Sequence, residues 1–261
     1  MADRPTIFIS GAANGIGRAT ADRFARGGYA VGVYDIDEAG ARAVAASLGG
    51  NARSGRLDVT DPESWNQALR TFAPAVDDRL DVLINNAGIM HTGALAAVDV
   101  AAHARTIDVN AKGVVFGCHA AHPYLRRTPG ARLVNLASAS AIYGQPDMAT
   151  YSATKFFVRG FTEALQIEWK ADGIAVAAVW PLYVDTALVS GTGRLASMEA
   201  LGVRLTSQDV ADDIWQLATR RMKRSRRTPH PVGFQTHASV LAEKLAPTAL
   251  TRFTVARLAG R

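Results

Sequence analysis

Cysteine and long apolar runs are scarce in this 261-residue sequence. Cys118 is the only cysteine, so neither an internal disulfide nor a thiolate metal cluster can form. No apolar run approaches the ~18 residues that a membrane span requires, and the run after Pro5 is too short for a signal peptide. His, Asp and Glu show no metal-ligand spacing, so we expect no catalytic metal. These absences predict a reduced, soluble and cytoplasmic protein.

The net charge of +6 comes from one segment. Residues 220–227 hold six basic side chains and no acidic one, and the remaining 23 Lys and Arg balance the 23 Asp and Glu. We interpret this segment as a solvated surface loop, as most charge runs are. Contact with nucleic acid or with an anionic membrane is the alternative.

The sequence does contain a regular alternation of apolar strands and amphipathic helices. Its hydrophobic share of 48% is too high for a disordered chain. Strands are predicted at 6–10, 30–34, 56–59, 80–84, 132–137 and 174–180, and helices at 15–26, 37–48, from 61 onward, 99–127 and 149–171. Continuous apolar strands separated by helices indicate a parallel sheet covered on both faces. Since no linker or repeat divides the chain, we predict one α/β domain over residues 1–261, a Rossmann-type doubly wound parallel sheet flanked by helices on both faces.

A glycine-rich turn joins the first predicted strand to the first helix. It contains Gly11, Asn14, Gly15, Ile16 and Gly17. Glycines permit a tight turn and the close approach of a pyrophosphate, while backbone N–H groups at the start of a helix favour an anion. The strand–turn–helix context therefore predicts a dinucleotide-binding site.

The choice of dinucleotide depends on Asp35, which ends the second predicted strand, eighteen residues beyond Gly17. A carboxylate there would accept hydrogen bonds from the adenosine ribose hydroxyls and would repel a 2′-phosphate. Ile36 and Asp37 supply no cation for such a phosphate. NAD is therefore predicted over NADP. The alternative for Asp35 is the N-cap of the following helix.

Further motifs follow the glycine turn in order along nearly the whole chain. They are Asp58-Val59 after the third strand, Asn85-Asn86-Ala87-Gly88 after the fourth, Asn110 in the long helix, Ser138 after the fifth strand, Tyr151 to Lys155 in the next helix, and Pro181 after the sixth strand. This set resembles the short-chain dehydrogenase/reductase superfamily, in its short single-domain branch. The resemblance implies cofactor contacts for Asp58, Val59, Asn86, Ala87, Gly88, Pro181, Val184 and Thr186, and also for Tyr151 and Lys155.

Tyr151 and Lys155 lie four residues apart, so a helix places them on one face. A free Tyr has a pKa of ~10, and a Tyr base near neutral pH needs its phenolate stabilised by ~4 kcal/mol, which a Lys charge helps to supply. The pair predicts Tyr151 as acid/base in a hydride-transfer reaction. The spacing also arises by chance, and its place in the predicted helix favours the catalytic interpretation.

Two more catalytic residues follow from the resemblance. It implies that the Ser138 hydroxyl binds the reacting oxygen and that Asn110 holds a water linking Lys155 to solvent. Ser140 is a second candidate for the serine. A buried amide at a helix irregularity is the alternative for Asn110, and the two roles are compatible.

The sequence departs from the family pattern at Leu182, which follows Pro181 where the family usually has Gly. We expect Leu182 to make the pocket floor narrower or more apolar. The other substrate-side candidates are Met90, His91, Ile142, Tyr143, Tyr183 and a lid at 186–205. They are mostly apolar, and no Arg among them is placed to bind a carboxylate. A hydrophobic secondary alcohol and its ketone, of alicyclic, aromatic or steroid-like type, are therefore predicted as substrates. For His91, a structural or solvated role is preferred.

Two segments have surfaces that suggest contacts with another subunit or with the substrate mouth. Phe156, Phe157 and Phe161 give the 149–171 helix a large aromatic surface, which predicts a homodimer or homotetramer; packing on the sheet is the alternative. The C-terminal tail, about 236–261, is amphipathic and basic. We expect it to cover the substrate mouth or a neighbouring subunit rather than to rest on an anionic membrane.

The motifs together predict an NAD-dependent short-chain alcohol dehydrogenase or ketone reductase. One rival is a catalytically silent NAD-sensing or nucleic-acid-binding regulator, supported only by the basic segment. A second rival is the longer branch of the superfamily, whose epimerases and dehydratases carry an extra C-terminal domain and a different glycine spacing.

Overall fold

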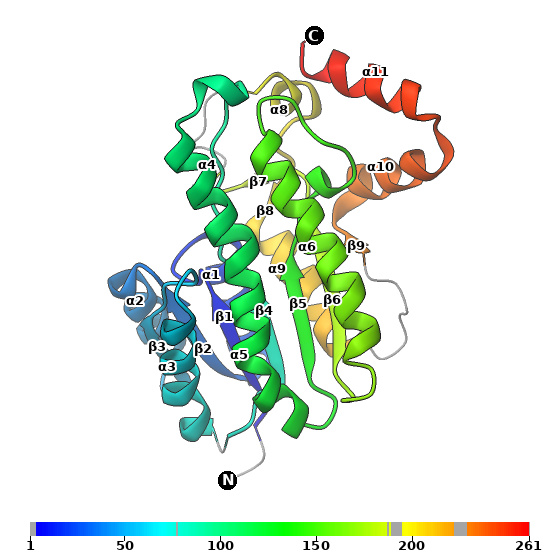
Figure 1. Cartoon of the computed structure of the whole chain (residues 1–261). Helices are drawn as coiled ribbons and strands as arrows, with labels where there is room; N and C mark the ends of the chain where they lie inside the picture. Colours follow the sequence, from blue (N-terminus) through cyan, green and yellow to red (C-terminus); the bar gives the residue numbers. More distant parts are fainter. Residues whose placement is uncertain (1–3, 77, 187, 189–194, 222–228, 261) are drawn as a thin grey trace.

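The computed structural model describes residues 4–76, 78–186, 188, 195–221 and 229–260 (Figure 1). Its main sheet has seven parallel strands in the order β3 (Ala52–Arg56), β2 (Ala30–Asp35), β1 (Thr6–Ser10), β4 (Val82–Asn85), β5 (Arg132–Leu136), β6 (Ala175–Trp180) and β9 (Pro229–Pro231). A second, two-stranded sheet pairs β7 (Val184–Asp185) with β8 (Leu205–Thr206). The strand order reverses between β1 and β4, as in a doubly wound fold.

Helices cover both faces of the main sheet. They are α1 (Gly15–Arg26), α2 (Glu38–Leu48), α3 (Pro62–Phe72), α4 (Val100–Ile107), α5 (Gly113–Arg127), α6 (Ala149–Glu168), α8 (Ala196–Leu201), α9 (Ser207–Gln216), α10 (Gly233–Leu245) and α11 (Thr248–Leu258). The core divides accordingly: Phe8 packs with side chains of α3, α5 and α6, while its neighbours Ile7 and Ile9 pack with α1, α2 and α9. This alternation is what a strand buried on both faces requires, and it confirms the predicted fold class.

The third strand was predicted in the wrong place. The structure has β3 at Ala52–Arg56, and the predicted segment 56–59 is mostly the loop that follows it. Leu57 and Val59 are buried in that loop, which made it look like a strand, whereas edge strand β3 is only half-buried and reads Ala-Arg-Ser-Gly-Arg. The sequence reading also missed the short strands β7, β8 and β9.

The long predicted helix 99–127 is interrupted. Between α4 and α5, residues Asp108–Lys112 form a π-helical turn, and this turn contains Asn110. Such bulges in an α-helix are frequent at functional sites. The irregularity anticipated for Asn110 is therefore present in the fold.

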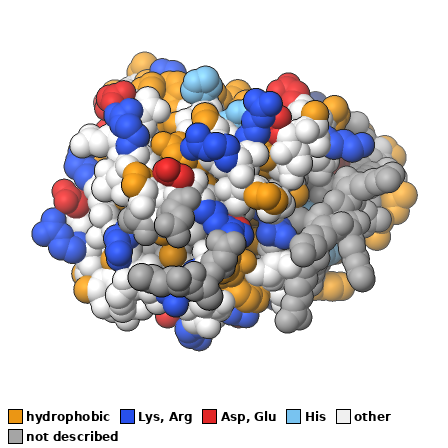
Figure 2. Space-filling view, turned by 90° about the horizontal axis from the view of Figure 1, so that it is seen from below, with side chains coloured by type: hydrophobic (Ala, Val, Ile, Leu, Met, Phe, Trp, Pro, Cys, Tyr) orange, Lys and Arg blue, Asp and Glu red, His pale blue; other side chains and the backbone are white. Residues whose placement is uncertain are grey.

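The carboxyl ends of the strands face α10 and α11, which lie at the end of the molecule opposite the N-terminus (Figure 1). Figure 2 shows the end where the strands begin, and there basic, acidic and hydrophobic side chains are interspersed. Among the described helices, none has the length and apolar character needed to cross a membrane.

Candidate active site

A cavity of about 670 Å³ lies at the carboxyl ends of the strands. Asp35 and Asp58 line one part of it, and α10 and α11 line another. Of the predicted site residues, the cavity wall includes Gly11, Asn14, Gly15, Ile16, Asp35, Asp58, Val59, Asn86, Ala87, Gly88, Ser138, Tyr151, Lys155, Pro181, Val184 and Thr186. Gly17 and Asn110 lie just behind this wall, and their neighbours show how they support it.

The glycine turn brings two backbone segments into close contact. A side chain at Gly11, where φ is +67°, would place its Cβ 2.7 Å from the Ala87 Cα atom. A Cβ at Gly17 would lie 2.1 Å from the Gly11 carbonyl oxygen. Neither position has room for a side chain, so the turn is held tight against the end of β4. A glycine turn of this kind allows the close approach that a dinucleotide pyrophosphate needs.

Asp35 faces the cavity and does not cap a helix. Its Oδ2 accepts a hydrogen bond from the Ala13 N–H at 2.9 Å, and its Oδ1 accepts one from the Asp37 N–H at 3.0 Å. The N-cap of α2 is Asp37, whose side chain accepts from the Gly40 N–H at 3.0 Å. The N-cap alternative for Asp35 is therefore wrong.

Asn86 ties the turn to β4. Its Nδ2 donates to the carbonyl oxygens of Ser10 and Gly11, at 3.0 and 2.7 Å.

Asp58 follows strand β3. Its Oδ1 accepts hydrogen bonds from the Thr60 hydroxyl and backbone N–H, at 2.7 and 3.0 Å. The Thr60 hydroxyl bond is the largest influence that holds the pKa of the Asp58 carboxyl below its ordinary value.

Asn110 is fully buried and bridges three elements. Its Oδ1 accepts from the Ile89 N–H and its Nδ2 donates to the Ile89 carbonyl, both at 2.8 Å. The same Nδ2 lies 3.2 Å from the Thr154 hydroxyl on α6. A Cβ at Gly88 would approach Asn110 Oδ1 at 3.3 Å and Lys155 Nζ at 3.8 Å. Asn110 thus has a structural role, and its carboxamide oxygen and the Lys155 Nζ both lie next to Gly88.

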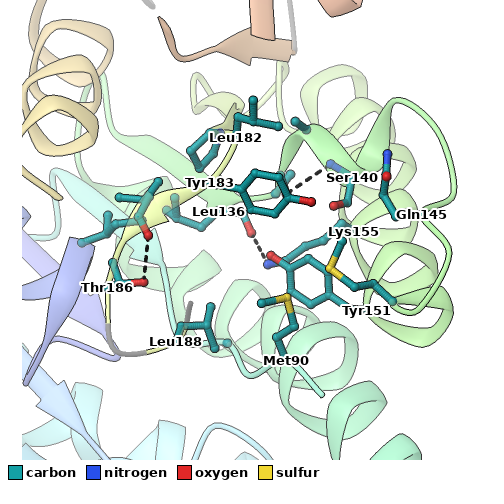
Figure 3. A pocket seen from close by; sticks show the side chains of 18 of the residues that line it. Met90, Leu136, Ser140, Gln145, Tyr151, Lys155, Leu182, Tyr183, Thr186 and Leu188 are labelled. Atoms are coloured by element: carbon teal, nitrogen blue, oxygen red, sulfur yellow. Dashed lines mark hydrogen bonds between the residues drawn. The ribbon is translucent and has the colours of Figure 1, made fainter. Parts of the chain in front are cut away.

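Tyr151, Lys155 and Ser138 all line the cavity. Figure 3 shows Tyr151 beside Lys155. Lys155 Nζ lies 5.5 Å from the centre of the Tyr151 ring and donates to the Leu136 carbonyl at 2.8 Å. Burial raises the pKa of Tyr151 to about 12, against the influence of a hydrogen bond with Ser138 that lowers it. Burial also lowers the pKa of Lys155 to about 8. Both shifts favour the neutral forms, as desolvation does.

Comparison with known proteins shows the family of the chain. The family model described as short chain dehydrogenase matches residues 5–194. The chain belongs to this family. It is an oxidoreductase by that membership, and its relatives include dehydrogenases of hydroxy compounds.

Three similar proteins illustrate the relationship. This short-chain dehydrogenase is 39% identical over 229 residues to the cis-4-hydroxycyclohexanecarboxylate dehydrogenase of Sinomonas cyclohexanicum, covering 84% of this chain and 90% of the relative. It is 32% identical over 212 residues to a 3-alpha-(or 20-beta)-hydroxysteroid dehydrogenase of Mycobacterium tuberculosis, covering 81% of each. The crystal structure of a Brucella melitensis 3-ketoacyl-(acyl-carrier-protein) reductase complexed with NADH superposes with a TM-score of 0.81 and 29% identity, covering 87% of this chain and 96% of that one.

Besides Ser138, Tyr151 and Lys155, the cavity wall contains the predicted substrate-side residues, with one exception. Met90, Ile142, Tyr143, Leu182 and Tyr183 belong to the wall. His91 does not appear among the lining residues; it is exposed and its Nδ1 lies 3.0 Å from the Thr106 hydroxyl. The preferred structural or solvated role for His91 therefore agrees with its position.

Leu182 and Tyr183 shape this part of the wall. Leu182 is partly buried against the core, and Figure 3 shows it beside Tyr183. The Tyr183 hydroxyl shares a hydrogen bond with the Ser197 hydroxyl at 2.7 Å. Burial, the larger influence, raises the pKa of Tyr183. Ser197 belongs to α8, which contributes Leu201 to the cavity wall.

The structure describes only parts of the predicted lid and of the basic segment. Residues 187 and 189–194 of the predicted lid lie outside the described residues, whereas Thr186, Leu188 and Leu201 line the cavity. Residues 222–227 of the basic segment also lie outside them.

The C-terminal segment forms much of the cavity wall, although the sequence analysis did not predict which of its residues would do so. The wall includes Ser239, Ala242, Glu243, Ala246, Leu250, Thr251, Thr254, Val255 and Leu258. Such a position agrees with the expectation that the tail covers the substrate mouth. Small and polar residues recur every three or four positions in α10, and that helical period was the available signal.

Proposed function

We propose that this protein is an NAD-dependent oxidoreductase that interconverts a hydrophobic secondary alcohol and its ketone. The observation that carries the proposal is the convergence of Ser138, Tyr151 and Lys155 in the cavity that the glycine turn and Asp35 also line. The proposed NAD site and the proposed proton acceptor, Tyr151, therefore adjoin each other.

Tyr151 serves as the acid/base. In alcohol oxidation its phenolate takes the hydroxyl proton of the substrate, and in ketone reduction its hydroxyl returns a proton to the oxygen. NAD, when bound, accepts the hydride from the carbinol carbon in the oxidative direction. A pKa of about 12 makes the phenolate scarce in the free protein, so its positive neighbour Lys155 is needed to stabilise it.

Ser138 and Asn110 complete the catalytic group. The Ser138 hydroxyl accepts from the Ser140 N–H at 3.1 Å and hydrogen-bonds Tyr151, which favours Ser138 over Ser140 as the residue that orients the substrate oxygen. Asn110 positions the Ile89 backbone and Thr154, and a water held beside it relays protons to Lys155.

The cofactor is NAD rather than NADP. The Asp35 carboxylate faces the cavity and accepts two backbone hydrogen bonds, one on each oxygen. Each oxygen keeps a further lone pair for a ribose hydroxyl, and the negative charge repels a 2′-phosphate. The cradle at Gly11 and Gly17 would hold the pyrophosphate, Val184 and Thr186 would contact the nicotinamide carboxamide, and Pro181 would also contact the cofactor.

The substrate is a hydrophobic ring alcohol. Met90, Ile142, Leu182 and Tyr143 give the wall apolar surface next to Tyr151. The names of two relatives, a hydroxycyclohexanecarboxylate dehydrogenase and a hydroxysteroid dehydrogenase, support alicyclic substrates.

The protein forms a homodimer or homotetramer through α6. Phe156 and Phe157 are 39% and 42% exposed, and Phe157 stacks on Phe161 with 5.6 Å between ring centres. Large exposed rings on one helix are typical of an interface between subunits.

The test is formation of the reduced cofactor, followed by its absorbance, over a panel of cyclic and acyclic secondary alcohols with NAD and NADP in parallel. We expect turnover with NAD and a loss of about 1,000-fold or more in Tyr151→Phe with NAD binding retained. Tyr143→Phe, another tyrosine of the cavity, is the matched control and should lose less than about tenfold. Tight NAD binding with no turnover of any alcohol or ketone would reject the proposal in favour of a regulator.

A further inference from the structure

One acidic side chain of the C-terminal arm, α10 and α11 (residues 233–258), faces the cavity. Glu243 lines the cavity from α10. Among the described lining residues, the other charged ones are Asp35, Asp58, Arg105 and Lys155. Asp35 ends β2 and Asp58 follows β3, both at the proposed adenosine end, and Arg105 Nη1 lies 3.4 Å from the Thr60 hydroxyl beside them. Glu243 is therefore the charged group that the arm contributes.

Arg159 fixes the position of that carboxylate. Arg159 follows Tyr151 and Lys155 on α6 at four-residue intervals, so the three lie along one face of the helix. Its Nη1 donates to Glu243 Oε1 at 3.2 Å and to the Ala141 carbonyl at 3.1 Å. Ala141 belongs to the turn that begins at Ser138. Glu243 is thus anchored beside the catalytic serine turn.

The charge of Glu243 is not fully compensated. Arg159 shares its guanidinium with a second carboxylate, since its Nε lies 3.3 Å from Glu163 Oε1. One cation therefore serves two acids, and the three side chains carry a net charge of −1. The Arg159 and Glu243 side chains are only 30% and 29% exposed, so solvent screens this charge incompletely.

We propose that Glu243 is a specificity-determining residue, which excludes alcohols with a carboxylate remote from the reacting hydroxyl and restricts the enzyme to uncharged substrates. This inference rests on the proposed function. A substrate carboxylate placed beside Glu243 would meet a like charge that solvent screens incompletely, and Arg159, the cation that pairs with Glu243, is already shared with Glu163. The relative from Sinomonas cyclohexanicum is, by contrast, named for a carboxylate.

The test compares substrates of the same shape and different charge. The probes are 4-hydroxycyclohexanecarboxylate with its carboxamide, and 4-hydroxycyclohexylacetate with its acetamide. For wild type, at least one pair should show kcat/KM about tenfold higher for the amide. Glu243→Gln keeps an acceptor for Arg159 and should lower that amide-to-acid ratio about tenfold. Glu163→Gln makes the same charge change on the other acid of Arg159, which does not line the cavity. It should lower the ratio much less than Glu243→Gln does, through the fuller pairing of Arg159 with Glu243.

Two results would overturn the proposal. One is a wild type that uses the acids as well as the amides, which would mean that Arg159 releases Glu243 to bind a substrate carboxylate. The other is an amide-to-acid ratio that falls as much in Glu163→Gln as in Glu243→Gln. That result would mean that the effect comes from the net charge alone and not from the position of Glu243.

A binding measurement separates this inference from the proposed function. Protection against thermal unfolding by cyclohexanecarboxamide and by cyclohexanecarboxylate, with NAD present, requires no turnover. The amide should protect wild type more than the acid does, and this difference should shrink in Glu243→Gln. If no alcohol is turned over, the proposed function fails, and equal protection by both ligands would still decide against Glu243. Turnover with an unchanged ratio rejects Glu243 alone.

Discussion

The two ends of the cavity are built by different means. At the glycine turn the wall is backbone, and Gly11 and Gly17 leave no space for even a Cβ atom. The C-terminal arm is built from side chains on two helices, and it leaves Phe234 and Leu245 87% and 76% exposed. The first end is therefore specified by a few positions that tolerate no change. The second is specified by size and polarity, which many side chains satisfy.

The largest expected effect is that of Gly17→Ala, at the glycine-turn end of the cavity. Its Cβ would lie 2.1 Å from a carbonyl oxygen of the backbone and 2.9 Å from the Ala12 Cα atom, neither of which is the end of a flexible side chain. We expect a loss of about 4 kcal/mol or more of stability, or a folded protein that no longer binds NAD. Thermal unfolding and NAD titration would measure this.

The matched control is Gly160→Ala. Gly160 lies within α6 with nothing within 4 Å of a built Cβ, so alanine should raise stability by about 0.5–1 kcal/mol. A Gly17→Ala protein with normal stability and normal NAD affinity would show that the turn is less constrained than its geometry requires.

The second prediction probes the other end of the cavity. Val255 lines the cavity from α11, whereas Phe253 on the same helix is 63% exposed. Val255→Asp places a charge in the apolar wall and should reduce kcat/KM for a hydrophobic alcohol by about 30-fold. Phe253→Asp should change it by less than about threefold. NAD affinity should be unaffected in both, since the cofactor end is separate. Equal losses in the two variants would mean that the arm is needed only as a whole.

The same contrast explains what the sequence could predict. The glycine turn, Asp35, Asn86 and Tyr151 each occupy a position where geometry or chemistry admits few residue types, so their motifs predicted residues that line the cavity. The β-strands that are buried on both faces were likewise recognisable as apolar runs. The fold class and the central strands of its sheet were therefore predictable, and the structure confirms the fold class.

Elements held in place by their neighbours were not predictable. Edge strand β3 is polar and is defined by pairing with β2, from Val31 opposite Ala52 to Asp35 opposite Arg56. Glu243 faces the cavity because Arg159, 84 residues earlier, anchors it. No local pattern reports such a contact, because it forms only when the chain folds.

The third prediction concerns Lys155, which lies between the two ends. Its pKa falls from 10.5 in the unfolded chain to about 8 on burial, so below pH 8 folding buries a charge. Lys155→Met should raise the free energy of unfolding by about 2 kcal/mol near neutral pH, after allowing for the lost hydrogen bond to Leu136. Chemical denaturation of the protein without cofactor measures the difference.

The pH dependence of that difference has a definite sign. Between pH 8 and 10.5 the unfolded chain keeps the Lys155 proton while the folded protein has lost it, so wild type gains stability as pH rises. The advantage of Lys155→Met should therefore shrink over this window. Lys170→Met, at an exposed lysine, should show no such slope. An advantage that is constant with pH would mean that Lys155 is solvated.

The smallest expected effect is at Leu182, where the backbone-built and side-chain-built parts of the wall adjoin. Leu182 follows Pro181 directly and is partly buried against the core while lining the cavity. Leu182→Gly should therefore widen the cavity, lowering KM for bulky ring alcohols by about threefold to tenfold, at a cost of about 1–2 kcal/mol in stability. Leu182→Ile conserves volume and should leave the substrate range nearly unchanged. If KM values over a series of increasing ring size are the same in wild type and Leu182→Gly, Leu182 does not bound the substrate. The limit on substrate size would then lie with the arm alone.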